Sequence, residues 1–153
     1  MIDLASYGYF KERVQEGTQT TDTPCFEVEA SQLVEAMTTL KEKEAYLMLL
    51  DHVAVDWLEK GTFELFYELY SLKSNQRLRI SVSIDRSNAK APSVSSVWKC
   101  AEFQEREVFD LMGISYEGHP DLRRLFLEDD WDGYPLRKDY KDDFMLELPD
   151  HVK

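Results

Sequence analysis

The sequence has few cysteines and no long apolar stretch, and each shortage excludes a class of protein. Cys25 and Cys100 are the only cysteines, and two thiolates cannot hold an iron–sulfur cluster, which takes four ligands. We expect both to be reduced packing residues. No run of about 18 apolar residues occurs, so no transmembrane helix is predicted. The start, MIDLASYGYFKERVQ, has no basic segment followed by an apolar one, so we expect no signal peptide.

The motifs of self-contained redox and hydrolytic enzymes are also missing. The six glycines never fall at G-x-G-x-x-G spacing, and no Walker, C-x-x-C, H-E-x-x-H or G-x-S-x-G motif occurs. His52, His119 and His151 are too scattered for a local metal site. We interpret His52 as a hydrogen-bonded strand residue, with a titrating pair with Asp51 as the alternative, and His119 as a turn residue. The acidic residues 128–130 lack EF-hand spacing, so no metal or cofactor is expected in this chain.

Basic residues are outnumbered 18 to 30 by acidic ones, which gives a net charge of −12. That balance argues against a nucleic-acid binder, which needs a basic face, and against unaided binding to an anionic membrane. A content of 43% hydrophobic and 12% aromatic residues in 153 positions indicates a folded domain with a modest core.

Periodicity predicts the elements of that domain. Helical spacing predicts a helix over 3–16, and another that Ser31 caps and whose core face is formed by Leu33, Ala36, Met37 and Leu40. CFEVEA (25–30) is predicted to be a short strand, and AYLMLLDHVAVDW (45–57) a central strand. Residues 62–71 and 76–85 alternate, which predicts half-buried strands with these residues facing the core: Phe63, Leu65, Tyr67, Leu69, Leu78, Ile80, Val82 and Ile84. Short links favour antiparallel pairing, and a last helix is predicted over 94–112.

Together these elements predict an α+β fold in two layers, with a mainly antiparallel mixed sheet packed by helices. We expect this domain to cover residues 1–112. Residues 113–153 have few periodic apolar positions and hold Gly113, Gly118, Gly133, Pro120 and Pro135. They are predicted to form an irregular C-terminal extension that must be held by the domain or by another subunit. Arg, Trp, Tyr and Phe, which it contains, are enriched at protein interfaces.

Glu105 has an unusual position on the predicted helix 94–112. At 100° per residue it falls within the apolar arc, whereas Glu107 points away and Arg106 and Asp110 lie on the opposite side. A carboxylate in that arc needs a partner. We predict that Glu105 is buried and bonded to an arginine or to backbone amides, with Arg123 or Arg124 nearest in sequence and Arg137 second. The alternative is that Glu105 sits at the edge of the arc and reaches water.

The stretch EREVFDLMGISYEGHPDLRRLF, followed by DWDGYPLRKDY, closely resembles the C subunit family of complex I, the proton-pumping type-I NADH:quinone oxidoreductase. Residues 1–20 carry no recognisable part of that pattern. The match also includes Gly113, Ile114 and Leu122. The matching residues that we predict to dock on partner subunits are Glu105, Arg106, Glu107, Asp110, Gly118, His119, Pro120, Arg123, Arg124, Trp131, Gly133, Pro135, Leu136, Arg137, Lys138, Asp139 and Tyr140.

The resemblance implies a peripheral-arm subunit without a cofactor of its own, while partner subunits carry FMN, iron–sulfur clusters and quinone. It implies a place beside the large subunit that helps form the quinone cavity and near the subunit with the terminal iron–sulfur cluster. The complex, and not the chain itself, would attach it to the cytoplasmic face of a bacterial inner membrane. Membrane-bound [NiFe] hydrogenases and ferredoxin- or F420-linked complexes contain a similar module and are the alternative. A third possibility is an independent carboxylate enzyme that uses Glu105, Glu107 and Asp110.

Overall fold

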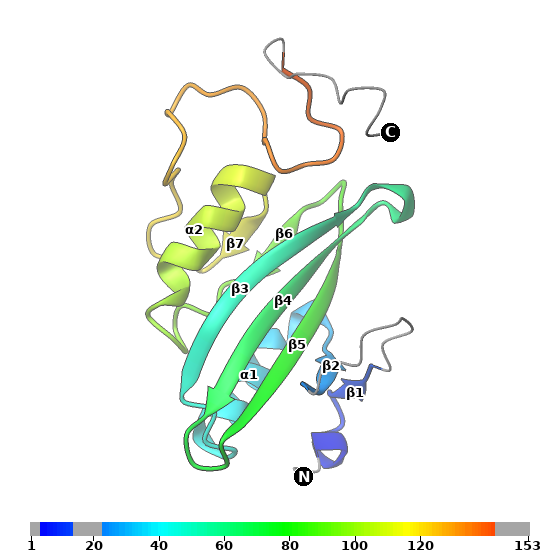
Figure 1. Ribbon diagram of the computed structural model, residues 1–153, viewed down its shortest axis with the longest axis vertical. Helices are drawn as coiled ribbons and strands as arrows, with labels where there is room; N and C mark the ends of the chain where they lie inside the picture. The colour runs from blue at the N-terminus through cyan, green and yellow to red at the C-terminus, as the bar shows by residue number, and fades with distance from the viewer. Residues whose placement is uncertain (1–3, 14–22, 143–153) are drawn as a thin grey trace, which may run out of the picture.

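The computed structural model describes residues 4–13 and 23–142 (Figure 1). Two α-helices, seven strands and three short 3-10 turns follow one another along these residues. In order they are η1 (Leu4–Tyr7), β1 (Lys11–Glu12), β2 (Cys25–Glu27), η2 (Ala30–Gln32), α1 (Leu33–Glu42), β3 (Met48–Trp57), η3 (Leu58–Lys60), β4 (Thr62–Ser71), β5 (Gln76–Asp85), β6 (Lys90–Pro92), α2 (Ala101–Met112) and β7 (Ser115–Glu117).

The main sheet has the strand order β1-β2-β5-β4-β3. Within this sheet only β2 and β5 pair parallel among the described strands, and the long strands β3, β4 and β5 form an antiparallel meander. The predicted α+β class with a mainly antiparallel mixed sheet is therefore confirmed. The prediction that residues 45–57 form a central strand was wrong, because β3 is an edge strand. Its outward residues Leu50 and Val53 stay exposed, so a long apolar run here does not mean burial on both faces.

The core lies between the sheet and the helices. The predicted inward residues of β4 are fully buried, as are Ile80 and Val82 of β5. Helix α1, which lies behind the sheet in Figure 1, buries its predicted face. The predicted cap by Ser31 was wrong, since neither η2 nor α1 has a side-chain cap. The short turn η2 leads directly into α1 instead.

The N-terminal segment differs from the predicted helix over 3–16. The described part consists of the turn η1, the two-residue strand β1 and the residues between them. Gly8 has φ +78°, a left-handed conformation that an α-helix cannot contain and that glycine adopts without strain. Residues 14–16 lie outside the described residues. The segment still contributes to the core, because Leu4 and Phe10 are buried.

Helix α2 begins at Ala101 and not at residue 94, since residues 94–100 form two short turns, at 95–97 and 99–100, and no helix. It ends at Met112, and the following residue, Gly113, has φ +71°. The core then continues through β7, which pairs parallel with β6: Ile114 is fully buried and Tyr116 is 3% exposed. The expected domain boundary at Met112 therefore falls inside the packed core. Independent folding of the two parts remains a prediction. Cys25 is buried, but Cys100 is exposed, so the packing role predicted for Cys100 was wrong.

His52 joins β7 to the sheet. Its Nδ1 lies 3.0 Å from the Phe66 carbonyl oxygen, so Nδ1 donates the proton there. Its Nε2 then accepts from the Tyr116 hydroxyl at 2.6 Å. Its ring also stacks on Tyr67 with 4.1 Å between ring centroids. This confirms His52 as a hydrogen-bonded strand residue. Burial lowers the pKa of His52 from 6.5 to about 4, against the opposite influence of the bond to Phe66.

We expect His52 to make the folded protein sensitive to mild acid. Between the unfolded pKa near 6.5 and the folded pKa of about 4, the unfolded chain binds a proton that the folded chain does not. Stability is therefore lost as pH falls through this window, by roughly 3 kcal/mol in total. Urea unfolding of the wild type and of His52→Gln from about pH 7 to about pH 4.5 measures this. The free energy of unfolding of the variant should fall less steeply with decreasing pH than that of the wild type. Equal pH dependence in the two proteins would contradict the lowered pKa of His52.

Candidate partner interface

Residues 118–142, which follow β7, are called the extension below. Its first part runs along α2, as the yellow-orange trace in Figure 1 shows. Three α2 residues spaced four apart hold it. His119 Nε2 donates to the Glu102 carbonyl oxygen at 3.0 Å, with Nδ1 accepting from the Asp121 amide. Arg106 donates to the carbonyl oxygens of Arg123 and Arg124 at 3.0 and 2.9 Å. Asp110 binds the residues that follow, so the extension advances along one side of the helix.

Asp110 of α2 accepts four hydrogen-bond donors from the extension. Its Oδ2 accepts the backbone N–H groups of Leu125, Phe126 and Leu127 at 2.9, 2.6 and 3.0 Å. Its Oδ1 accepts from Arg124 Nη1 at 2.9 Å. Burial alone would raise the pKa of Asp110, but these three amides and Arg124 outweigh it and lower the pKa to about 2. The carboxylate is fully buried. The sequence placed it correctly opposite the apolar arc but did not predict that the extension covers it.

The end of α2 is the second attachment point. The Leu136 amide donates to the Leu111 carbonyl oxygen at 3.0 Å, and Arg137 Nε donates to that of Met112 at 2.6 Å. Arg137 also lies 4.6 Å from the centre of the Tyr134 ring. A cation here satisfies free carbonyls and complements the helix dipole. Gly113 allows this approach, since a Cβ there would lie 2.5 Å from Tyr134 and 2.6 Å from Arg137.

The third attachment ties the extension to the sheet. The Lys138 amide donates to Asp56 Oδ2 at 2.9 Å. Arg86 bridges Asp56 Oδ1 at 2.9 Å and Asp139 Oδ1 at 2.5 Å. Burial opposes ionisation of Asp56, but Arg86 and the Lys138 amide still lower its pKa. Asp56 and Arg86 were not predicted from the sequence. The spacing in β3 could have identified Asp56, because it follows the inward residues His52 and Ala54 at two-residue steps and so lies on the same face of the strand.

Glu105 is fully buried, as its position in the apolar arc predicted. Its Oε1 accepts the Val94 amide at 2.7 Å and its Oε2 accepts the Ser93 hydroxyl at 2.6 Å. The backbone-amide alternative is confirmed, and the idea that Glu105 reaches water was wrong. Burial raises the pKa of Glu105, and the Ser93 and Val94 bonds oppose that shift. His119 Nε2 is 3.9 Å away.

The arginines proposed as partners of Glu105 bind elsewhere. Arg124 binds Asp110 and the Trp131 carbonyl oxygen, Arg137 binds the end of α2, and Arg123 forms an exposed pair with Asp121 at 2.9 Å. Glu105 therefore fixes the loop between β6 and α2. It meets the extension only through the longer approach of His119.

Several matched residues remain accessible after these contacts. Glu107, Gly118, Pro120, Arg123, Trp131, Leu136, Lys138 and Asp139 are exposed. Gly133, Pro135 and Tyr140 are half-buried within the extension. Three large apolar side chains of the extension are exposed, Phe126 at 63%, Trp131 at 38% and Leu136 at 59%. The acidic residues Glu128, Asp129, Asp130 and Asp132 are also exposed, and none forms an ion pair with another described residue.

These contacts argue against catalysis by Glu105, Glu107 and Asp110. Glu105 and Asp110 are fully buried and already bonded to their own chain, whereas Glu107 points outward. No group of three or more potential ligands that could hold a metal occurs within 4–13 and 23–142.

Comparison with known proteins gives consistent matches. Residues 26–143 match the family model described as respiratory-chain NADH dehydrogenase, 30 kDa subunit. The C subunit of NADH-quinone oxidoreductase from Moorella thermoacetica is 44% identical over 128 residues, which are 84% of each chain. The C/D subunit of NADH-quinone oxidoreductase from Phocaeicola vulgatus is 44% identical over 115 residues, which are 74% of this chain and 22% of that protein.

Two solved structures resemble the chain throughout most of its length. A chain of a membrane-bound sulfane sulfur reductase, an archaeal respiratory membrane complex, superposes with a TM-score of 0.77 and 27% identity, covering 90% of this chain and 81% of that one. A trypsin-resistant fragment of Nqo5 superposes with a TM-score of 0.65 and 28% identity, covering 77% and 92%. Among the described residues, none of the helices has the length and apolar character needed to cross a membrane.

Proposed function

We infer the function of this chain from its family, since it belongs to the family of the 30 kDa subunit of respiratory-chain NADH dehydrogenase. We propose that it is a cofactor-free structural subunit of a proton-translocating NADH:quinone oxidoreductase. Electrons would pass from NADH through FMN and iron–sulfur clusters of other subunits to quinone. The chain itself would organise the peripheral arm by holding the large subunit that helps form the quinone cavity. It would contact the subunit with the terminal iron–sulfur cluster nearby, and reach the cytoplasmic face of the membrane only through the complex.

One observation carries this proposal: in the relative from Phocaeicola vulgatus the matched region makes up only 22% of a protein named as a C/D subunit. Fusion of two subunits joins parts that work together, so the D portion is the favoured partner. The exposed aromatic and apolar residues of the extension support a protein interface. The buried and fully bonded carboxylates support a structural role rather than a catalytic one.

We expect a tagged copy, expressed in a host from which its own gene has been deleted, to bring the large subunit and NADH:quinone reductase activity out of solubilised membranes. The purified chain alone should show no absorbance band beyond roughly 300 nm and no stoichiometric flavin or iron, since those chromophores need ligand sets that the sequence does not contain. Recovery of the tagged chain free of the large subunit would contradict the assembly role. A coloured chain would contradict the cofactor-free role.

The second candidate is the equivalent subunit of a membrane-bound hydrogenase, a ferredoxin-linked complex or a related sulfur-reducing complex. The TM-score of 0.77 with a sulfane sulfur reductase chain favours keeping it. The same purification separates the two, because this alternative predicts recovered complexes without an NADH-oxidising, FMN-containing part.

A further inference from the structure

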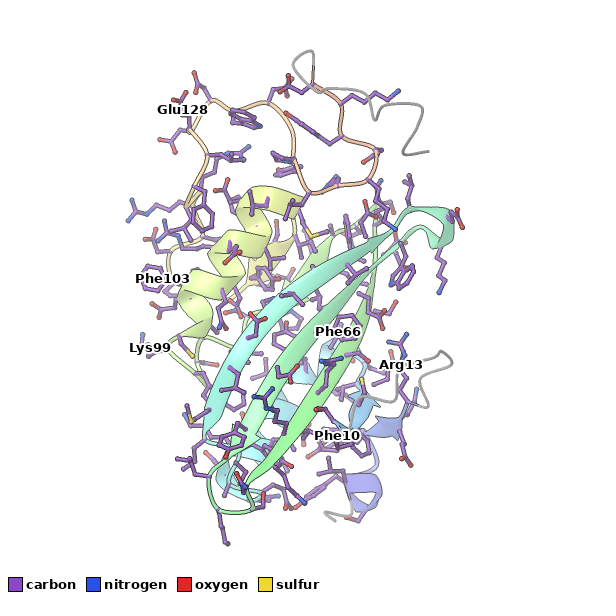
Figure 2. The ribbon with its side chains drawn as sticks, viewed as in Figure 1. Phe10, Arg13, Phe66, Lys99, Phe103 and Glu128 are labelled. Carbon is purple, nitrogen blue, oxygen red and sulfur yellow. The ribbon has the colours of Figure 1, made fainter. Side chains whose placement is uncertain are left out.

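One exposed phenylalanine lies on α2 and another lies in the part of the extension that is bonded to α2. Phe103 is 61% exposed and Phe126 is 63% exposed, and Figure 2 shows Phe103 projecting outward from the helix. Arg106 connects them. Its guanidinium lies 5.8 Å from the Phe103 ring centre, and it binds the carbonyl oxygens of the two residues that precede Leu125 and Phe126. Single exposed apolar residues are common, but here Arg106 ties the helix that carries Phe103 to the segment that carries Phe126. We call Phe103, Arg106 and Phe126 the phenylalanine surface.

The backbone that presents Phe126 is held before any partner binds. Three consecutive amides, including that of Phe126, donate to the buried Asp110 carboxylate. Phe103 lies within the regular helix α2. Ordering a loop at an interface is one of the costs that association must overcome. Here the backbone at both positions is already fixed by contacts inside the chain, so part of that cost is met before a partner binds.

The surroundings of Phe126 define the charge of a matching surface. Glu128, Asp129 and Asp130 follow it within four positions and are exposed, and Figure 2 shows Glu128 at the outer side of the extension. None of the three forms an ion pair within the part of the chain described. Complementary charge at an interface favours correct encounter. A partner that covers Phe126 should therefore place basic side chains around an apolar pocket.

We propose that the phenylalanine surface is the anchor for the large subunit, with Phe126 and Phe103 filling an apolar pocket whose rim is basic. This inference rests on the proposed function. The large subunit is favoured over other partners by the C/D relatives, in which a further region accompanies the one that this chain matches. A region joined to this module is confined near it, and such confinement raises the effective concentration for binding.

The test uses the full chain with a tag in the deletion host and measures the large subunit recovered per tagged chain. Phe126→Ser and Phe103→Ser should each lower recovery, roughly tenfold for Phe126, as expected for truncation of a central aromatic anchor. Leu72→Ser is the matched control, because Leu72 is 65% exposed in the turn between β4 and β5 and should recover as the wild type does. All three variants should melt like the wild type, since they change exposed side chains.

The outcomes separate this inference from the proposed function. If the wild type fails to recover the large subunit, the proposed function fails. If the wild type succeeds and both phenylalanine variants match it, or if Leu72→Ser is equally impaired, the anchor is overturned while the function stands. The triple variant Glu128→Gln, Asp129→Asn, Asp130→Asn tests the basic rim. Its recovery should be lower and less sensitive to salt, and stronger recovery would overturn the proposed charge of the pocket.

Discussion

Replacing Asp110 with alanine is expected to lower the free energy of unfolding by roughly 3–5 kcal/mol, the usual cost of breaking a buried charged pair. The change removes the acceptor of three backbone amides and of Arg124 at once. Each donor would be left without its partner next to a helix that still excludes water. Urea unfolding followed by circular dichroism measures the loss. Asp110→Asn should be intermediate, because one amide oxygen remains but the amide nitrogen faces donors.

The pH dependence identifies the charged form of Asp110 as the stabilising one. Its folded pKa of about 2 lies below the ordinary value of 3.8. The resulting stability, about 2–3 kcal/mol, is therefore present above about pH 4 and is lost as pH falls through about 2. The difference in the free energy of unfolding between the wild type and Asp110→Asn should become smaller as pH falls from about 4 through about 2. Asp129→Ala is the control, since Asp129 is exposed. A loss in Asp110→Ala no larger than in this control would contradict the role of Asp110.

Replacing Glu105 with alanine is the second change expected to have a large effect, with a loss of roughly 3 kcal/mol or more. The variant leaves the Val94 amide without an acceptor, removes one partner of the Ser93 hydroxyl, and opens a cavity in the core. Glu105→Gln should cost much less. Its amide oxygen can accept the Val94 N–H, and its amide nitrogen can donate to Ser93, whose hydroxyl can rotate.

The sign of the pH effect at Glu105 is opposite to that at Asp110. Burial raises the pKa of Glu105 above 4.5, so the folded state binds the proton more tightly than the unfolded state. Its contribution is greatest below the unfolded pKa and is lost as pH rises through the folded pKa. The free energy of unfolding of the wild type, relative to that of Glu105→Gln, should therefore decrease as pH rises through the folded pKa of Glu105. Glu107→Ala, an exposed change two residues away, is the control, and an equal loss in both alanine variants would contradict an anchoring role for Glu105.

Alternating and helical patterns in the sequence predicted those strands and helices whose burial depends mainly on residues close in the chain. The alternation in β4 and β5 follows directly from one buried face, and Phe63 and Ile80 lie where that pattern puts them. The edge position of β3 could not be predicted this way, because strand order depends on contacts between distant segments. The start of α2 was missed because residues 94–100 continue an apolar pattern, while Glu105 binds Val94 from the helix and holds these residues in turns.

The motif residues show a similar division. Their types predicted a binding segment, and the burial of Glu105 followed from helical geometry. The partners of Asp110, Arg124 and Arg137 could not be predicted from the sequence, because each bond depends on how the extension returns along α2. Arginine and aromatic residues are equally suitable for an interface and for fixing an irregular segment to its own domain. In this chain Asp110, Arg124 and Arg137 fix the extension to its own domain. The exposed aromatic residues remain available for an interface.

Amide hydrogen exchange of Leu125, Phe126 and Leu127 in the purified chain tests most directly whether the extension is folded by its own domain before it meets a partner. We expect these three amides to be protected in the isolated chain, and Asp110→Asn to remove the protection. If they exchange at the rate of an unstructured peptide in the isolated chain and become protected only within the assembled complex, the motif would act by docking, and a self-held extension would be contradicted.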